Sequence, residues 1–293
     1  MSPSLYALAA IALWASLAAL GLALQHLPPF LLTGLALMTG SLLAWPSVLR
    51  DRRQWQVSLP VLCLGILTLF GFHFFLFIAL RLASAVEVNL VNYLWPLLIV
   101  VLAPVYLPQT KLRAFHVVAA AIGFAGAALA IWSAAPPGGA IASADTRNAV
   151  WGYALAFCSA WIWANYSLQT KRLALAGRSF PTAAIGLFGL VAGALSLLCH
   201  AVLEPATRLS GTDWLLVLAM GLGPLGAAFY AWDKALKRGD ARHIGLLSYL
   251  TPLASTVLLL AVTGRPLTWT LAMAAAMVIG AALLGSAGET DPA

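Results

Sequence analysis

Successive apolar runs fill most of this sequence and constrain its fold more than any other feature. They lie near residues 5–24, 29–49, 57–80, 84–107, 113–133, 149–170, 181–203, 213–233, 241–263 and 267–286. The hydrocarbon layer of a bilayer is about 30 Å thick, and a helix needs about 20 apolar residues to cross it. With 62% hydrophobic and only 9% charged residues, the chain is too apolar for a water-soluble domain. The sequence therefore predicts an all-α polytopic membrane protein that crosses the bilayer about ten times.

One segment stands out between the apolar runs because it is rich in proline, glycine and small polar residues. It extends from Ala134 to Asn148 and reads as a linker. We therefore expect a first unit at residues 1–134, a linker at 135–148 and a second unit at 149–293. The first apolar run has no basic leader, so we expect a retained helix and not a cleaved signal peptide.

Lysine and arginine are distributed unevenly over the predicted loops. If the N-terminus is cytoplasmic, twelve of the sixteen basic residues lie at the inner ends of the runs. Only Arg81, Arg147, Arg208 and Arg265 lie outside. The positive-inside rule then predicts that both termini are cytoplasmic. The basic residues occur singly or in threes, so they indicate topology in a lipid membrane and not a nucleic-acid-binding face.

The two halves share an internal repeat. A constant shift places Tyr93 over Tyr249 and Pro96 over Pro252, and it also matches Gly65 with Gly221, Ala79 with Ala235 and Arg81 with Lys237. A slightly different shift matches Tyr6 with Tyr153 and Trp14 with Trp161, and a third matches Gly34 with Gly186. Since each unit has five crossings, the second unit enters the membrane from the opposite side. Inverted repeats of this kind are the structural basis of alternating access to a central site.

The repeat and the segment E-V-N-L-V-N-Y-L-W-P-L at 87–97 resemble the drug/metabolite transporter superfamily, in its EamA-type branch. That segment and the aromatic run at 71–77 are similar to those of the YddG-like aromatic amino acid exporters. The resemblance covers nearly the whole chain. It implies a monomer in the bacterial inner membrane, with a central cavity lined mainly by helices 1, 3, 4, 6, 8 and 9.

Polar side chains gather in the fourth apolar run, where they are costly. Asn89, Tyr93 and Pro96 share one helix face, and Asn92 and Trp95 lie on its flank. Pro96 frees the carbonyl of the residue four positions earlier, and Pro252 does the same in the second unit. Such carbonyls are tolerated at membrane depth where protein or a water-filled cavity satisfies them. Kinks that serve packing alone are the alternative.

Other aromatic and polar residues lie inside the runs, away from the interfaces. The candidate substrate-binding residues are Trp14, His73, Asn89, Asn92, Tyr93, Trp95, Trp161, Trp163, Asn165, Tyr230 and Tyr249, with Pro96 and Pro252 as candidate kinks that take part in gating. For His73 a structural hydrogen bond is the alternative, and for the tryptophans a lipid-facing position. The glycine run at 186, 189 and 193 is expected to pack closely against another helix.

Charged residues inside or beside the runs are read as structural. Asp233 lies beside Lys234, Lys237 and Arg238, where we expect a solvated cluster. Glu87 lies near Arg81, where an interfacial ion pair is expected. Glu87 is the only acidic residue expected inside a run and away from the basic inner ends, so we predict facilitated diffusion over obligatory proton antiport. Antiport through titration of His73 is the alternative.

The predicted function is export of neutral, preferentially aromatic amino acids, with a broad-specificity drug or metabolite exporter of the same superfamily as the alternative. The aromatic side chains suit flat apolar cargo, and the neutral amides suit a zwitterion. The outward direction rests on the resemblance alone. The scattered histidines and three unpaired cysteines predict no metal site, cofactor or enzyme activity, and no ring of pore-lining charges indicates a channel.

Overall fold

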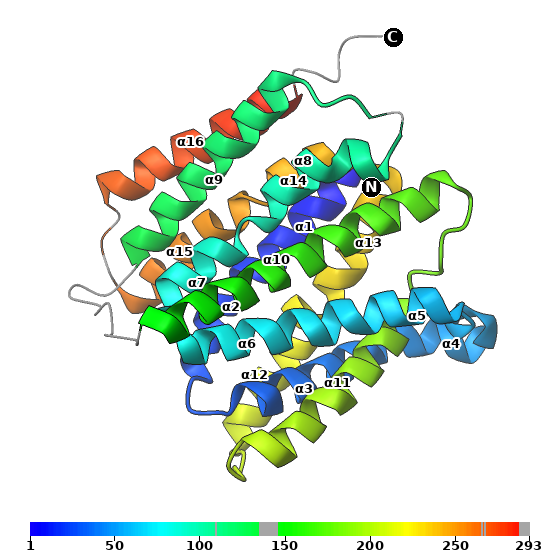
Figure 1. Cartoon of the computed structure of the whole chain (residues 1–293). Coiled ribbons are helices and arrows are strands. Elements are labelled where there is room, and N and C mark those ends of the chain that lie inside the picture. Colours follow the sequence, from blue (N-terminus) through cyan, green and yellow to red (C-terminus); the bar gives the residue numbers. More distant parts are fainter. Residues whose placement is uncertain (109, 135–145, 265, 267, 287–293) are drawn as a thin grey trace.

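The computed structural model describes residues 1–108, 110–134, 146–264, 266 and 268–286, and all regular structure within them is helical (Figure 1). Eight helical segments are long and apolar enough to cross a membrane. They are Pro3–Ala23, Pro29–Arg50, Leu59–Leu82, Ala85–Tyr106, Ala114–Trp132, Ala184–Leu203, Gly211–Arg238 and Ala241–Thr263. The prediction of an all-helical, multi-pass membrane protein is confirmed. The predicted linker lies outside the described residues except for 146–148, which begin a helix.

Two further helices correspond to the remaining predicted runs but are not among those eight. α10 (Thr146–Leu175) is 30 residues long and carries many polar and aromatic side chains. α16 (Trp269–Ser286) has a shorter apolar stretch, Trp269–Leu284.

Most spans consist of more than one helical element. The first half contains α1 (Pro3–Ala15), α2 (Leu17–Ala23), α3 (Pro29–Ser41), η1 (Leu42–Ala44), α4 (Trp45–Arg50), η2 (Arg52–Trp55), α5 (Leu59–Ile66), η3 (Leu67–Gly71), α6 (Phe72–Leu82), α7 (Ala85–Asn92), α8 (Trp95–Tyr106) and α9 (Ala114–Ala134). The second half contains α10, α11 (Ala184–Leu203), α12 (Gly211–Leu222), η4 (Gly223–Ala227), α13 (Ala228–Arg238), α14 (Ala241–Leu247), α15 (Leu250–Thr263) and α16.

A π turn interrupts the third span and another interrupts the span Gly211–Arg238. Each turn, η3 and η4, is 5 residues long, and each is followed by a helix of 11 residues, α6 or α13. Both turns and both helices begin and end at positions related by the shift that places Tyr93 over Tyr249. The order of elements from α5 to α8 therefore recurs from α12 to α15.

The next span in each half is broken just before its proline. α7 ends at Asn92 and α8 begins at Trp95, while α14 ends at Leu247 and α15 begins at Leu250. Pro96 and Pro252 lack an amide hydrogen, and their rings crowd the preceding turn, so a continuous α-helix is unfavourable there.

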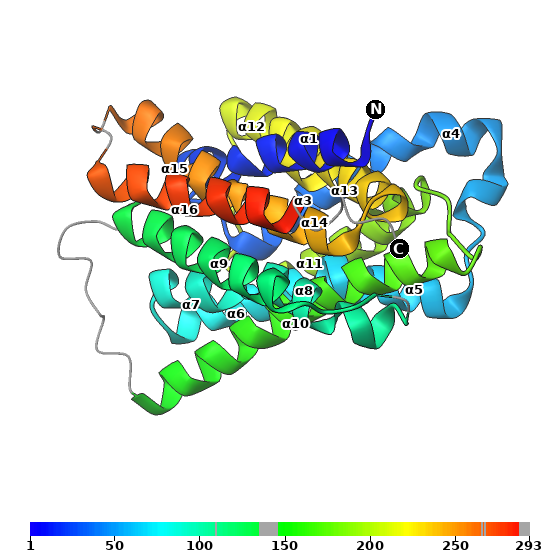
Figure 2. The ribbon, with the colours of Figure 1, turned by 90° about the horizontal axis from the view of Figure 1, so that it is seen from above.

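Helices of the two halves pack against each other reciprocally. α1 packs on α13, α14 and α15, and α10 packs on α6, α7 and α8. α3 packs on α11, and α9 lies beside α16 at one edge of the molecule (Figure 1, Figure 2).

The predicted glycine run of α11 does pack closely, against α3. A Cβ added at Gly193 would lie 2.8 Å from the carbonyl oxygen of Gly34, and one at Gly186 would lie 3.0 Å from that of Ser41. Such approach of backbones is possible only for residues without a side chain.

Candidate binding cavity

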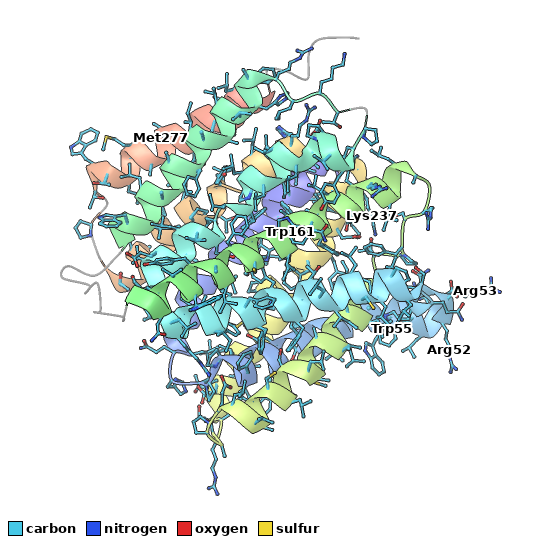
Figure 3. All side chains as sticks on the ribbon, viewed as in Figure 1. Arg52, Arg53, Trp55, Trp161, Lys237 and Met277 are labelled. Atoms are coloured by element: carbon cyan, nitrogen blue, oxygen red, sulfur yellow. The ribbon has the colours of Figure 1, made fainter. Side chains whose placement is uncertain are left out.

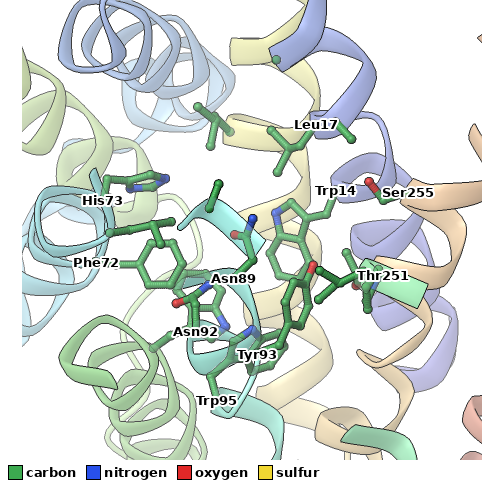
Figure 4. Close-up of a pocket in the computed structure, with 18 of the residues that line it drawn as sticks. Trp14, Leu17, Phe72, His73, Asn89, Asn92, Tyr93, Trp95, Thr251 and Ser255 are labelled. Atoms are coloured by element: carbon green, nitrogen blue, oxygen red, sulfur yellow. The ribbon is translucent and has the colours of Figure 1, made fainter. Parts of the chain in front are cut away.

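A cavity of about 590 Å³ lies between helices of both halves (Figure 4). Residues of α1, α2, α3, α6, α7, α8, α9, α10, α12, α13, α15 and η4 line it. The lining residues lie either at mid-span or near one end of the spans. Gly21 and Thr33 mark that end, where the first span stops and the second span starts. The cavity therefore extends toward that end of the molecule and stops at mid-span.

Four rings close the cavity at mid-span, and we call Trp14, Trp95, Trp163 and Phe229 the aromatic floor. The ring centroid of Trp163 lies 5.6 Å from Trp14, 6.2 Å from Trp95 and 5.6 Å from Phe229. The fully buried Trp232 supports the floor from behind, 5.2 Å from Trp14 and 5.6 Å from Trp95. These tilted and edge-on contacts are the favoured geometries of aromatic pairs. The floor thus separates the cavity from a packed region toward the opposite end.

Two ring N–H groups in the cavity wall bind carbonyls of the π turns. Trp14 Nε1 donates to the Pro224 oxygen of η4 at 3.1 Å, and His73 Nδ1 lies 2.6 Å from the Leu69 oxygen of η3. Because a carbonyl only accepts, His73 Nδ1 carries the hydrogen, and Nε2 of the neutral ring is an acceptor. His73 therefore has one nitrogen fixed by the fold and one available to a ligand.

Polar groups also belong to the cavity lining. Asn89 is half-buried and lies between His73 and Trp14 (Figure 4). Asn92 Oδ1, Trp163 Nε1 and Thr251 Oγ1 are buried without a hydrogen-bond partner in the protein. Buried polar groups normally have partners, so these three are suited to meet the polar groups of a ligand.

The lining is uncharged. Within the described part of the chain, none of the residues that line the cavity is Asp, Glu, Lys or Arg. The described residues also contain no group of three or more His, Cys, Asp and Glu side chains placed to hold a metal ion. The arrangement suits a ligand without net charge.

Most of the candidate residues from the sequence meet in this cavity. Those that line it are Trp14, His73, Asn89, Asn92, Tyr93, Trp95, Trp163 and Pro252.

The other five candidates lie outside the lining. Trp161 is 42% exposed on the outer surface (Figure 3). Asn165 Oδ1 accepts from the Tyr106 hydroxyl at 2.8 Å, and the Tyr230 hydroxyl donates to the Gly40 oxygen at 3.3 Å.

Tyr249 is fully buried, with its ring against Gly123, and Pro96 is buried as well. In this conformation both residues are packed inside the protein.

The sequence match between the ends of α1 and α10 is out of register by two residues. Ser4 Oγ lies 3.3 Å from His243 Nε2, and the Tyr153 hydroxyl donates to Glu87 Oε2 at 2.5 Å. Glu87 and His243 occupy the same position in the repeat, so Ser4 corresponds to Tyr153. With that pairing Trp14 corresponds to Trp163, which also belongs to the aromatic floor, and not to the exposed Trp161.

Some lining residues were not predicted, among them Phe229, Thr251 and Ser255. The repeat carries a signal for two of them, since Phe229 corresponds to His73 and Thr251 to Trp95. Ser255 has no such counterpart among the predicted candidates.

The expected pair between Arg81 and Glu87 is wrong. Arg81 Nη2 instead lies 3.2 Å from Glu204 Oε1. The Glu204 side chain is 1% exposed and also accepts from the backbone amides of Phe30 and Leu31 at the start of α3. A carboxylate at a helix N-terminus is favoured by the orphan amides there.

The expected solvated cluster around Asp233 is also wrong. Asp233 is fully buried. Its Oδ2 pairs with Lys237 Nζ at 2.7 Å and accepts from the Thr182 hydroxyl at 2.6 Å, and these contacts offset the cost of burying the charge. Lys237 also donates to the Phe180 oxygen at 2.7 Å and lies over the Phe180 ring. α13 is thus tied to the chain before α11 on the closed side of the aromatic floor.

Comparisons with known proteins place this architecture among transporters. The sequence profile of the EamA-like transporter family matches residues 1–132 and 150–286. An aromatic amino acid exporter YddG of Ancylobacter novellus is 39% identical over 292 residues, which cover 97% of each chain. An aromatic amino acid exporter YddG of Escherichia coli is 30% identical over 69% of this chain and 67% of its own. A protein crystal structure superposes with a TM-score of 0.87 and 38% identity, covering 97% of both chains.

Proposed function

Because this chain belongs to the EamA-like transporter family, we propose that it exports neutral, preferentially aromatic amino acids by alternating access. The relatives from Ancylobacter novellus and Escherichia coli are named as aromatic amino acid exporters. The observation that carries the proposal is the cavity itself, which is lined with aromatic rings and neutral polar groups and lacks charged side chains among the described residues.

The aromatic floor supports a flat apolar side chain as cargo. A ring pair in edge or offset geometry contributes about 0.5–1.5 kcal/mol beyond burial, and Trp14, Trp95 and Phe229 present such faces around Trp163. The cavity of about 590 Å³ is within the usual range for small-molecule sites.

Neutral polar groups support a zwitterionic head group. His73 Nε2 and the Asn92 oxygen can accept from an ammonium, while Trp163 Nε1 can donate to a carboxylate. A sugar phosphate would call for a buried arginine or lysine, and such charge-assisted pairing is missing from the described lining.

The alternating-access part of the proposal includes ten crossings, in units 1–134 and 149–293 related as inverted repeats. It is supported by the recurrence of η3–α6 as η4–α13 and by the reciprocal packing of α1 and α10. α10 and α16 would supply the two crossings beyond the eight apolar segments. If α1 took up the packing that α10 has now, and α10 took up that of α1, the site would open to the opposite end of the molecule.

The proposed membrane is the bacterial inner membrane, with both termini cytoplasmic and the protein acting as a monomer. Basic residues of the predicted inner loops, including Arg52, Arg53 and Lys237, lie toward one side of the molecule (Figure 3). In this orientation the cavity faces outward. A cysteine introduced at Ala140 would react with an impermeant thiol reagent from outside; labelling only from the cytoplasm would contradict the topology.

We also propose that transport follows the substrate gradient without obligatory proton exchange. The Glu87 carboxylate binds the Tyr153 hydroxyl and is not part of the cavity lining. Substrate-driven proton movement in sealed vesicles would contradict this part.

The substrate proposal can be tested by counterflow in proteoliposomes. Vesicles preloaded with unlabelled phenylalanine are expected to accumulate labelled phenylalanine and tryptophan. A nucleotide sugar and a quaternary ammonium drug should not be accumulated in matching experiments, because the described lining of the outward-facing cavity offers no charged partner to either.

The variant Trp95→Ala is expected to reduce counterflow at least about ten-fold, since it removes a ring of the floor. Trp161→Ala is the matched control and should retain transport. Failure of both aromatic amino acids while a competitor moves would overturn the proposal, and so would normal transport by Trp95→Ala.

A further inference from the structure

Phe77 and Asp233 occupy the same position in two equivalent helices. Each is the sixth residue of its helix, α6 or α13, and each helix follows a π turn. Phe77 lines the cavity and packs on the Phe30 ring, 5.6 Å between centroids. Asp233 lies beyond the aromatic floor and accepts from the Thr182 hydroxyl.

The partners of these two residues also correspond. The shift that places Gly34 over Gly186 also places Phe30 over Thr182. The close contacts between α3 and α11 are related by the same shift. A Cβ at Gly34 would lie 3.0 Å from the Gly193 oxygen, and a Cβ at Gly186 would lie 3.0 Å from the Ser41 oxygen. An aromatic pair at one end of the molecule is therefore replaced by an acid and a hydroxyl at the other.

One oxygen of Asp233 is left without a partner. Oδ2 receives both the Lys237 ammonium and the Thr182 hydroxyl, while the buried Oδ1 has no hydrogen bond. An unpaired carboxylate oxygen in a fully buried site is costly, so it calls for an explanation, and use in another state of the protein is one.

We propose that Asp233 binds the ammonium group of the substrate in the conformation that opens to the cytoplasm. This inference rests on the proposed inverted-repeat exporter. When the two halves exchange their packing, positions equivalent to the present lining come to line the opposite cavity, so Asp233 takes the place that Phe77 has now. Oδ1 then accepts a hydrogen from the ammonium while Lys237 stays on Oδ2.

The two faces of the transporter therefore differ in what they recognise. The cytoplasmic-facing site has a carboxylate for a primary amine, and the outward-facing site has the Phe77 ring at the same position. An aromatic amine without a carboxylate should compete more strongly at the cytoplasmic face than from outside, where His73 Nε2 and the Asn92 oxygen offer its ammonium only neutral acceptors.

Inhibition of labelled phenylalanine uptake tests this difference in membrane vesicles of defined sidedness. Phenethylamine, which keeps the ammonium, and 3-phenylpropanoate, which lacks it, are added to inside-out and right-side-out vesicles. In the wild-type protein phenethylamine should inhibit more strongly in inside-out vesicles. Asp233→Asn should raise its half-inhibitory concentration there at least about ten-fold and leave that of 3-phenylpropanoate unchanged or lower.

Thr182→Val is the matched control, since it removes a hydrogen bond to Asp233 but keeps the carboxylate, and phenethylamine should still inhibit it. Asp233→Glu should also retain inhibition. Two results would overturn the proposal. One is an equal change in the half-inhibitory concentrations of both ligands in Asp233→Asn, which would reveal only a structural tie between α13 and Thr182. The other is equal inhibition of the wild-type protein by phenethylamine from both faces. Absence of phenylalanine uptake by the wild-type vesicles would instead contradict the proposed function.

Discussion

The hydrogen bond from Trp14 to η4 gives a test of how the cavity wall is held. In Trp14→Phe the ring remains aromatic, but the donor to the Pro224 oxygen, now 3.1 Å away, is lost. A buried hydrogen bond contributes about 0.5–1.5 kcal/mol net, and an orphaned partner raises the cost to about 3 kcal/mol. We expect a loss of about 1–3 kcal/mol in stability, since Trp14 is only 7% exposed and the smaller ring also leaves space beside Trp163.

The assay combines thermal unfolding of the purified protein in detergent with phenylalanine counterflow. Trp14→Phe should unfold at a lower temperature and transport more slowly, because η4 positions Phe229 and Leu225 in the cavity wall. Trp161→Phe makes the same chemical change on an exposed side chain, so both measurements should match the wild-type protein.

Equal effects of the two substitutions would refute the reasoning. So would a Trp14→Phe protein as stable as the wild type, because the ring N–H would then not hold the π turn.

Three further substitutions test separate parts of the structure. Asn89→Leu keeps the approximate size of a side chain that lines the cavity but removes its amide. The KM for phenylalanine should rise about two- to ten-fold in counterflow, and an unchanged KM would exclude this amide from the site. Gly40→Ala places a Cβ 2.8 Å from the Leu225 oxygen and should lower stability by about 1–3 kcal/mol in detergent unfolding, whereas Gly280→Ala, with open space around it, should be neutral or slightly stabilising. Glu204→Gln should cost about 1–3 kcal/mol by the same measurement, and an unaltered unfolding temperature would show that the carboxylate charge is dispensable.

The spans were predictable because the bilayer imposes a length and an apolar composition on each crossing. The breaks inside them were predictable only where a proline removes a donor, as at Pro96 and Pro252. The π turn at 67–71 has no such mark in the sequence, and the one at 223–227 contains Pro224, which by itself does not distinguish a π turn from a break in the helix. Each turn also involves a side chain outside it: Trp14, in α1, binds a carbonyl of the turn at 223–227, and His73, in the helix that follows directly, binds one of the turn at 67–71.

The candidate site was predictable where polar side chains lie in an apolar run, as Asn89 and Asn92 do. Hydropathy does not give the rotation of a helix about its axis, so the sequence predicts both Trp161 and Trp163 as binding residues, although only Trp163 lines the cavity. Asp233 was placed in solvent because its neighbours in sequence are basic. A tertiary contact with Thr182 and the neutralising pair with Lys237 allow the chain to bury it instead.

The π turns also affect how related chains are to be aligned. In a π turn the hydrogen bond spans five residues, against four in an α-helix, so each turn holds one residue more than a regular helix would. A relative that lacks a single residue within 67–71 or 223–227 can continue the same helix, with His73 or Phe229 kept on the same face. A one-residue gap at these places would therefore mark a straightened helix and not the loss of a loop.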